Sequence, residues 1–144
     1  MSTDRIEKRV VLRAPRSRVW RAISDAKEFG TWFRITLDGA FAAGKTVRGS
    51  HGPFKVEMQV ERIEPERYFS YRWHPYPKDP AQDYAGEPMT LVEFTLEDAE
   101  GGGTALTIVE SGFDQIPLAR RAEAFRMNTE GWGGQIKNLE RYVS

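Results

Sequence analysis

The sequence predicts an α+β domain in which one curved antiparallel β-sheet packs against a single long C-terminal helix. Between Arg34 and Ser111 apolar residues recur at every second position, which is typical of antiparallel strands with one buried face. From Pro117 onwards they recur at steps of three and four, which is typical of a helix with one buried stripe. The 144 residues are expected to form one domain, residues 1–144.

The first elements are a strand and two short helices. The segment RIEKRVVLRAP, residues 5–15, is rich in β-branched residues and stops at a proline, so it predicts the first strand. Pro15 suits the first turn of the helix that RSRVWRAISD predicts. The segment AKEFGTWF then predicts a second short helix, capped by Ser24 or Asp25.

The middle of the chain predicts a run of antiparallel strands. Apolar and polar residues alternate in FKVEMQVERI (54–63), RYFSYRW (67–73), TLVEFTLE (90–97) and TALTIVE (104–110). The turn that joins the last two strands falls at EDAEGGG, where glycine tolerates the positive φ of a tight turn. Clean alternation predicts a sheet with one packed face and one solvated face.

The last element is predicted to be a helix of about 40 Å, at about 1.5 Å per residue. Its apolar stripe is expected to contain Leu118, Ala122, Phe125, Thr129, Trp132, Ile136, Leu139 and Val143. This stripe is expected to pack on the concave face of the sheet. Gly131, Gly133 and Gly134 weaken the helix, which a kink, a neighbouring void or close packing on a strand would explain.

The octapeptide GAFAAGKT, residues 39–46, matches the phosphate-loop pattern G-x-x-x-x-G-K-[ST]. A phosphate loop needs a helix directly after it, because the N-terminus of that helix binds the phosphates. The following segment contains Gly49, Gly52 and Pro53, which disfavour a helix. The neighbouring strands also alternate, unlike the continuously apolar strands of parallel sheets. The segment 39–46 is therefore predicted to be a β-turn connection, and no nucleotide-binding site is expected.

Composition excludes several classes of partner. The 21 basic and 21 acidic residues balance, so a nucleic-acid partner is not expected. No run approaches the roughly 20 apolar residues of a membrane helix, and the first residues hold no apolar signal segment, so no membrane insertion and a cytoplasmic location are expected. The absence of cysteine excludes disulfides and thiolate metal sites.

The two histidines, His51 and His74, predict no metal site and no catalytic triad. A triad needs a Ser or Cys nucleophile, and the sequence has no nucleophile-elbow pattern and no cysteine. A histidine metal site needs at least three convergent ligands, and no motif spacing joins the histidines to Asp79 or Asp83. No catalytic residue and no cofactor is therefore assigned.

Glu110 is the charged residue that the strand pattern singles out. By parity with Leu106 and Ile108 it lies on the inner face, at the end of the last strand. A buried carboxyl group must be hydrogen-bonded, ion-paired or raised in pKa. Two interpretations stay open: Glu110 caps the next turn at a solvated strand end, or it is a polar anchor or general base in an apolar pocket.

The loop HPYPKDPAQDYAGEP, residues 74–88, is long and contains four prolines. Loops of this length are uncommon without a function. It is interpreted as a semi-rigid lid over a cavity mouth, with a simple surface excursion as the alternative.

The order of these elements resembles the helix-grip fold of START-like (SRPBCC) domains. The segments APRSRVWRAISD, TWF, AFAAG, FSYRW, LVEFTLED, GGGTALTIVESGF and GWGGQIKNLERYV are similar, in this order, to the heat-shock-protein-90 ATPase activator-homologue family. Phe41 and Gly44 match a Phe-x-x-Gly turn of that family, and Lys45 replaces a second glycine that many members carry. That replacement completes the false phosphate-loop pattern.

The resemblance implies a deep pocket between the long helix and the sheet. Related proteins bind lipids, polyketides, hormones or other apolar molecules, and some are cyclases or aromatases. The eukaryotic chaperone activators carry a further N-terminal domain that this sequence does not include. A chaperone partner is therefore not expected.

The leading hypothesis is the binding of a small hydrophobic or aromatic ligand, lipid-like or polyketide-like, in a cavity between the sheet and the C-terminal helix. Four Trp, eight Phe and five Tyr are available either to fill a core or to line such a cavity. The predicted apolar lining is Phe33, Phe41, Met58, Tyr71, Trp73, Phe94, Phe125 and Trp132. The predicted polar contacts are Glu110, Thr129 and Gln135.

Two other hypotheses remain. The first is a cyclase-like or hydrolase-like enzyme that uses the same cavity, with Glu110 or His74 as acid or base. The second is a protein-interaction module, including chaperone binding or a homodimer formed through a sheet edge or the 74–88 loop.

Overall fold

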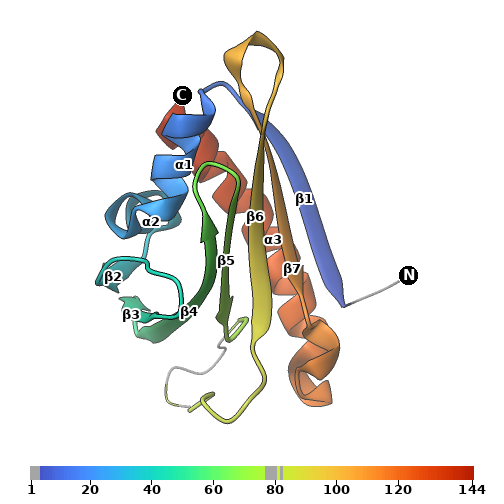
Figure 1. Cartoon of the computed structure of the whole chain (residues 1–144). Coiled ribbons are helices and arrows are strands. Elements are labelled where there is room, and N and C mark those ends of the chain that lie inside the picture. The colour runs from blue at the N-terminus through green and yellow to red at the C-terminus, as the bar shows by residue number, and fades with distance from the viewer. Residues whose placement is uncertain (1–3, 77–80, 82) are drawn as a thin grey trace.

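In the computed structural model, which describes residues 4–76, 81 and 83–144, a single antiparallel sheet curves around the long C-terminal helix (Figure 1). The seven strands lie in the order β1-β7-β6-β5-β4-β3-β2. They are β1 (Arg5–Leu12), β2 (Thr36–Asp38), β3 (Thr46–His51), β4 (Phe54–Glu64), β5 (Tyr68–Trp73), β6 (Thr90–Asp98) and β7 (Thr104–Ser111). The helices are α1 (Arg16–Ser24), α2 (Ala26–Phe33) and α3 (Leu118–Val143), with short 3-10 turns η1 (Glu100–Gly102) and η2 (Phe113–Gln115). The predicted α+β architecture is confirmed.

Helix α3 lies behind the sheet in Figure 1 and crosses it, while α1 and α2 lie beside the C-terminal half of α3. The core therefore forms between three surfaces: the concave face of the sheet, the inner face of α3, and the apolar side of α1 and α2.

Within the described ranges, no helix is both long enough and apolar enough to cross a membrane.

The inner face of the sheet carries the predicted apolar rows. One row crosses five strands through directly paired residues, all of them buried: Val60, Tyr71, Val92, Glu110 and Ile6. In β4 the predicted alternation holds only as far as Val60, because a bulge shifts the register between Val60 and Arg62. A bulge bends its strand and increases the local twist, which helps the sheet to curve.

The connection that contains the phosphate-loop pattern is a turn, as the sequence predicts. It joins β2 to β3, so a strand and not a helix follows Thr46. Gly44 has a φ of 80°, and the Lys45 N–H donates to the carbonyl oxygen of Ala42 at 3.0 Å. No helix N-terminus is present here to bind phosphate.

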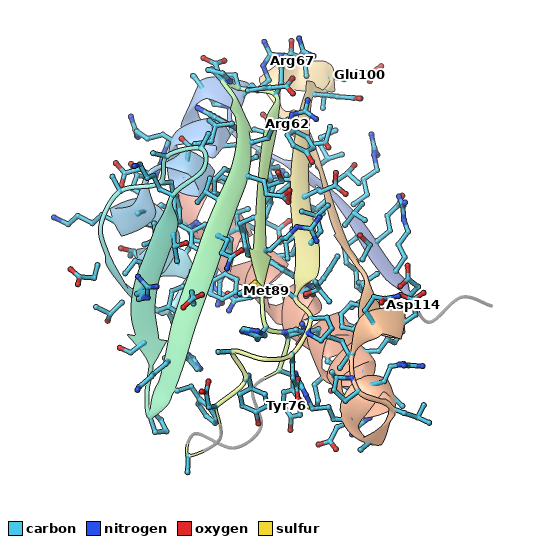
Figure 2. All side chains as sticks on the ribbon, turned by 60° about the horizontal axis from the view of Figure 1, so that its bottom comes forward. Arg62, Arg67, Tyr76, Met89, Glu100 and Asp114 are labelled. Carbon is cyan, nitrogen blue, oxygen red and sulfur yellow. The ribbon has the colours of Figure 1, made fainter. Side chains whose placement is uncertain are left out.

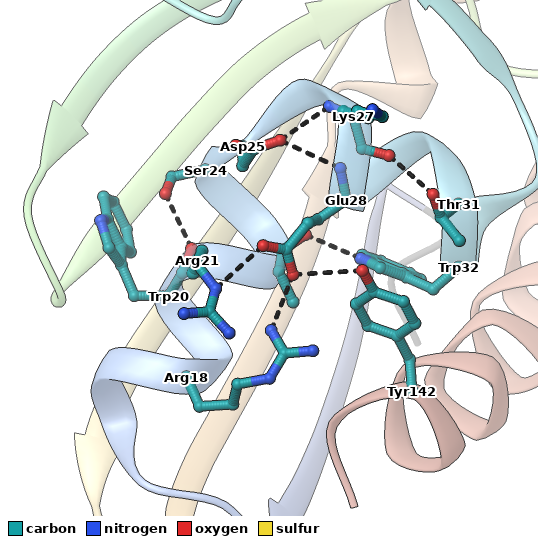
Figure 3. Close-up of polar contacts among 11 residues, drawn as sticks. Arg18, Trp20, Arg21, Ser24, Asp25, Lys27, Glu28, Thr31, Trp32 and Tyr142 are labelled. Atoms are coloured by element: carbon teal, nitrogen blue, oxygen red, sulfur yellow. Dashed lines mark hydrogen bonds and ion pairs between the residues drawn. The ribbon is translucent and has the colours of Figure 1, made fainter.

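A cluster of polar contacts around Glu28 joins the three helices (Figure 3). Arg18 Nη1 donates to Glu28 Oε1 at 2.7 Å and Arg21 Nε lies 2.9 Å from Glu28 Oε2. From the last turn of α3, the Tyr142 hydroxyl donates to Glu28 Oε1 at 3.2 Å, and its ring lies beneath the Arg18 guanidinium. Asp25 caps α2 by accepting from two backbone N–H groups. These contacts fix the C-terminal end of α3 against α1 and α2.

The buried face of α3 differs from the predicted stripe at its N-terminal end. Leu118 is 78% exposed and Ala122 is also exposed, although both were predicted to face the sheet. Ala124 is fully buried instead, and Asn128 lies one turn further along the same face. The prediction was wrong here because the first turns of α3 extend beyond the end of β7, where no sheet covers them (Figure 1).

The three glycines of α3 face open space. Apart from its chain neighbours and the nearby backbone of α3 itself, a Cβ atom built on Gly131, Gly133 or Gly134 meets no atom within 4 Å, and the helix is continuous through all three. Close packing against a strand is therefore not the reason for these glycines.

We expect Gly131→Ala and Gly134→Ala each to raise the free energy of unfolding by about 1 kcal/mol, because alanine loses less backbone entropy than glycine in a helix. Urea unfolding measures the change. Gly103→Ala is the control, since its Cβ would lie 2.7 Å from the carbonyl oxygen of Leu12, and we expect it to destabilise the protein. Destabilisation by both helix substitutions would show that something covers this face.

Candidate functional site

The carboxyl group of Glu110 lies at the centre of the candidate site and is fully buried. Its Oε2 accepts from Trp73 Nε1 at 2.8 Å and from Thr90 Oγ1 at 2.6 Å. Its Oε1 accepts from Trp132 Nε1 at 2.8 Å, and Asn128 Nδ2 lies 2.9 Å from Oε1 and 3.2 Å from Oε2. Burial overturns the interpretation of Glu110 as a cap at a solvated strand end and leaves the polar-anchor and general-base interpretations.

The electrostatic state of Glu110 follows from these contacts. All four donors are neutral, and within the described part of the chain no lysine or arginine pairs with the carboxyl group. Burial in an apolar interior raises the pKa of Glu110, and the four hydrogen bonds lower it again by a smaller amount. The net pKa is above the ordinary glutamate value. Glu110 is therefore a buried acid with no countercharge among the residues that the structure describes.

Tyr71 lies in the same cross-strand row as Glu110, two strands away. Its hydroxyl is buried and has no hydrogen-bond partner among the described residues. Burial, and secondly the negative charge of Glu110, raises the pKa of Tyr71 well above its ordinary value, so the hydroxyl keeps its proton. A buried hydroxyl without a partner is destabilising, because it has given up its hydrogen bonds to water.

Aromatic rings surround these two polar groups. The Trp73 ring centroid lies 5.3 Å from that of Tyr71 and 5.9 Å from that of Trp132. Phe33 and Phe94 each lie 5.8 Å from Trp132. The structure thus brings together six of the predicted residues: Phe33, Tyr71, Trp73, Phe94, Glu110 and Trp132. We call these six residues the aromatic–carboxyl cluster.

The other predicted residues lie around this cluster. Met58 is fully buried, and Phe41 contacts Phe69 with ring centroids 5.1 Å apart. Phe125 packs edge-on against Phe113, with ring centroids 5.3 Å apart. The remaining two are polar: the Thr129 hydroxyl donates to the Phe125 carbonyl within α3, and Gln135 Nε2 donates to the Phe33 carbonyl at 3.0 Å.

Sequence reasoning missed three residues of this region. Thr90 shares the inward parity of Val92, so the strand pattern alone could have placed it. Asn128 lies outside the predicted helix stripe, and no sequence signal marked it. Phe29 of α2 is fully buried with its ring centroid 6.3 Å from those of Tyr71 and Phe94.

The loop predicted to be a lid is held to the first turn of α3 by Arg120. Figure 2 labels Tyr76 near the start of this loop and Met89 directly after it. Arg120 Nη1 donates to the carbonyl oxygens of Pro75 and Tyr76 at 2.9 and 2.8 Å, and Arg120 Nε donates to Glu87 Oε1 at 2.9 Å. Residues 77–80 and 82 of the loop, Asp79 among them, lie outside the described residues. Like Asn128, Arg120 was not marked by any sequence pattern.

The two histidines contact backbone carbonyl groups and not the residues of the aromatic–carboxyl cluster. His51 Nδ1 is 3.1 Å from the carbonyl oxygen of Arg34, and His74 Nε2 is 3.1 Å from that of Glu87. Over residues 4–76, 81 and 83–144, no group of three potential metal ligands occurs. A surface hollow of about 520 Å³ lies elsewhere, between residues 11–15 and 100–103, and none of the predicted site residues lines it.

Comparisons with known proteins place this geometry in a family. Solved structures with the same fold include MLL2253 from Mesorhizobium loti, with 24% identity, 96% of each chain covered and a TM-score of 0.78. DynU16, a protein in the dynemicin biosynthetic locus, has 24% identity and a TM-score of 0.76, with 97% of this chain and 47% of that chain covered. The Aha1 dimer from Colwellia psychrerythraea has 15% identity and a TM-score of 0.76, with 96% and 95% covered.

These likenesses show the helix-grip fold that the sequence predicts. No curated protein matches the sequence significantly. The family model described as Activator of Hsp90 ATPase homolog 1-like protein matches residues 13–144, which is most of the chain. The chain therefore belongs to the family of Activator of Hsp90 ATPase homolog 1-like proteins.

Proposed function

We propose that the protein binds a small hydrophobic or aromatic ligand, lipid-like or polyketide-like, between the sheet and α3. The observation that carries the proposal is the buried Glu110 carboxyl group, which pairs with no cation among the described residues. Its charge acts on the buried Tyr71 hydroxyl, which has no hydrogen-bond partner among the same residues. The unpaired Tyr71 hydroxyl destabilises the fold of the protein alone. A few convergent polar groups with perturbed pKa values in an apolar setting are typical of ligand sites.

The comparisons support this proposal at the level of the fold. One structural neighbour, DynU16, is a protein of a biosynthetic locus, which fits a role with small molecules. Another neighbour is a dimer, which fits the homodimer that the sequence left open. Both likenesses are below 25% identity, so the ligand and the oligomeric state are proposals for this chain.

The contacts of Glu110 favour anchoring over proton transfer. Each carboxyl oxygen already accepts hydrogen bonds from at least two donors. A general base must accept a proton from the substrate, and this requires a free lone pair within hydrogen-bond reach of the reacting group. We therefore assign Glu110 the role of holding α3, β5 and β6 in position around the ligand.

The test follows the four tryptophan indole N–H signals by NMR while flat two-ring and three-ring aromatic compounds are added. We expect saturable shifts of the Trp73 and Trp132 signals, because both indoles belong to the aromatic–carboxyl cluster. Trp20 on α1 is the internal control, and its signal should stay unchanged. If no compound shifts the Trp73 and Trp132 signals, the proposal is wrong.

A further inference from the structure

We infer that the ligand is a neutral aromatic compound that presents a carbonyl oxygen to the Tyr71 hydroxyl, and that carboxylate ligands are excluded. The inference rests on the proposed function and specifies the ligand of that same site. It depends on three features of the described residues: the Tyr71 donor, which none of them accepts from, the occupied acceptors of Glu110, and the absence among them of a countercharge to Glu110.

The first feature is the Tyr71 hydroxyl. It is buried and keeps its proton, yet no described residue accepts a hydrogen bond from it. A ligand that offers an acceptor atom supplies the missing partner and removes the penalty of an unpaired donor. A ligand that offers only a donor leaves the Tyr71 proton unpaired. The complementary group on the ligand is therefore an acceptor.

The second feature is the saturation of Glu110. Trp132 and Asn128 occupy Oε1, and Trp73 and Thr90 occupy Oε2. A ligand hydroxyl or amine finds no free carboxyl oxygen to bind. Recognition of the ligand thus falls on Tyr71, and Glu110 acts by positioning the rings of the two tryptophans.

The third feature is charge. Within the described residues, no lysine or arginine pairs with the carboxyl group of Glu110. A fatty acid or another carboxylate would bring a second acid next to Glu110, where no described residue supplies a cation to offset the desolvation of its charge. Like charges at short range in a low dielectric also repel strongly. The site therefore selects against anionic ligands.

The rings around Tyr71 select the shape of the ligand. Its ring centroid lies 5.3 Å from that of Trp73, 6.2 Å from that of Phe94 and 6.3 Å from that of Phe29. Aromatic pairs prefer offset or edge-to-face contacts at such separations. A flat aromatic ketone or quinone would offer ring contacts of the same kind, while its carbonyl oxygen would accept a hydrogen bond from the hydroxyl.

The experiment compares three naphthalenes of nearly equal shape at pH 7.5: 2-acetylnaphthalene, 2-isopropenylnaphthalene and 2-naphthoate. They place a carbonyl, an alkene or a carboxylate on the same ring. Dissociation constants come from the shifts of the Trp73 and Trp132 indole signals. We expect the ketone to bind about tenfold more tightly than the alkene, which is the usual contribution of one buried hydrogen bond, and the naphthoate to bind more weakly than the alkene.

Tyr71→Phe is the matched variant. It removes only the hydroxyl, which has no hydrogen-bond partner among the described residues, so we expect the variant to fold with undiminished stability. In this variant the ketone should bind no more tightly than the alkene, and the alkene should bind as in the original protein.

Equal binding of ketone and alkene to the original protein would overturn the inference, as would naphthoate that binds as tightly as the ketone. Both results would leave the proposed function standing, because a ligand would still occupy the cluster. If none of the three compounds binds and the wider aromatic panel also fails, the proposed function falls and the inference falls with it.

Discussion

Glu110→Ala is expected to lower the free energy of unfolding by about 4 kcal/mol, in the range found when one partner of a buried polar network is removed. The carboxyl group is fully buried and is the shared acceptor of four side-chain donors. After truncation these donors face an apolar interior, and each unpaired buried donor costs about 1–3 kcal/mol before relaxation. Urea unfolding monitored by circular dichroism measures the loss.

Glu110→Gln removes the charge and one acceptor oxygen of the side chain while keeping its volume almost unchanged. Trp73 and Trp132 donate to different carboxyl oxygens, so a glutamine satisfies one indole and turns its own N–H₂ group toward the other. We expect a loss of about 2 kcal/mol, the penalty of one unpaired buried donor. The control is Glu93→Gln on the neighbouring strand, where the half-buried carboxylate accepts from the Tyr68 hydroxyl. There we expect less than about 1 kcal/mol.

A Glu110→Gln protein as stable as the original would contradict this account, because it would mean that the indole contacts do not depend on the carboxylate. Adding Trp132→Phe provides a further check. The Trp132 indole donates to Glu110, so the two substitutions should be less than additive.

The second large effect is an unusual dependence of stability on pH. Burial raises the pKa of Glu110 in the folded protein, whereas in the unfolded chain the group titrates near its ordinary value of about 4.3. Between these two pKa values the folded protein holds a proton that the unfolded chain has released. The contribution of Glu110 to stability is therefore fully present below about pH 4.3 and is lost as the pH rises through the folded pKa.

The measurement is the difference in unfolding free energy between the original protein and Glu110→Gln, taken from pH 4 to pH 8. We expect the original protein to lose stability relative to the variant as the pH rises, by at most about 1.4 kcal/mol per pH unit, which is the limit for one proton. The Asp4–Asp114 pair also titrates, but it is present in both proteins and cancels in the difference. A slope of the opposite sign would mean that the four hydrogen bonds outweigh burial.

The sequence predicted the fold because the spacing of apolar residues along a strand or helix is a local property of the chain. The alternation in TLVEFTLE and TALTIVE identified two neighbouring strands, and the same parity placed Glu110 on the inner face. The glycine and proline residues after Thr46 excluded a helix, and β3 confirms this. Each conclusion needed only residues a few positions apart, since strand and helix periods are set by the backbone itself.

Which residues of α3 face the sheet could not be predicted in the same way. Leu118 and Ala122 extend the stripe of Leu139 and Val143 by the same steps, yet both are exposed. The first turns of α3 extend beyond the end of β7 (Figure 1). The true inner face includes Asn128, a polar residue that a hydrophobic pattern discards. The bulge after Val60 escaped prediction for a similar reason, because it depends on how two strands pair and not on either strand alone.

What the sequence determined by itself is therefore the set of elements, their order and the side of β7 that carries Glu110. Only the tertiary structure decided what surrounds that carboxyl group. Trp73 lies 37 residues before it and Trp132 lies 22 residues after it, on different elements. They meet because of the twist of the sheet, the distance of α3 from it, and the rotation of α3 about its own axis. The packing of the whole core sets these quantities, and no local pattern encodes them.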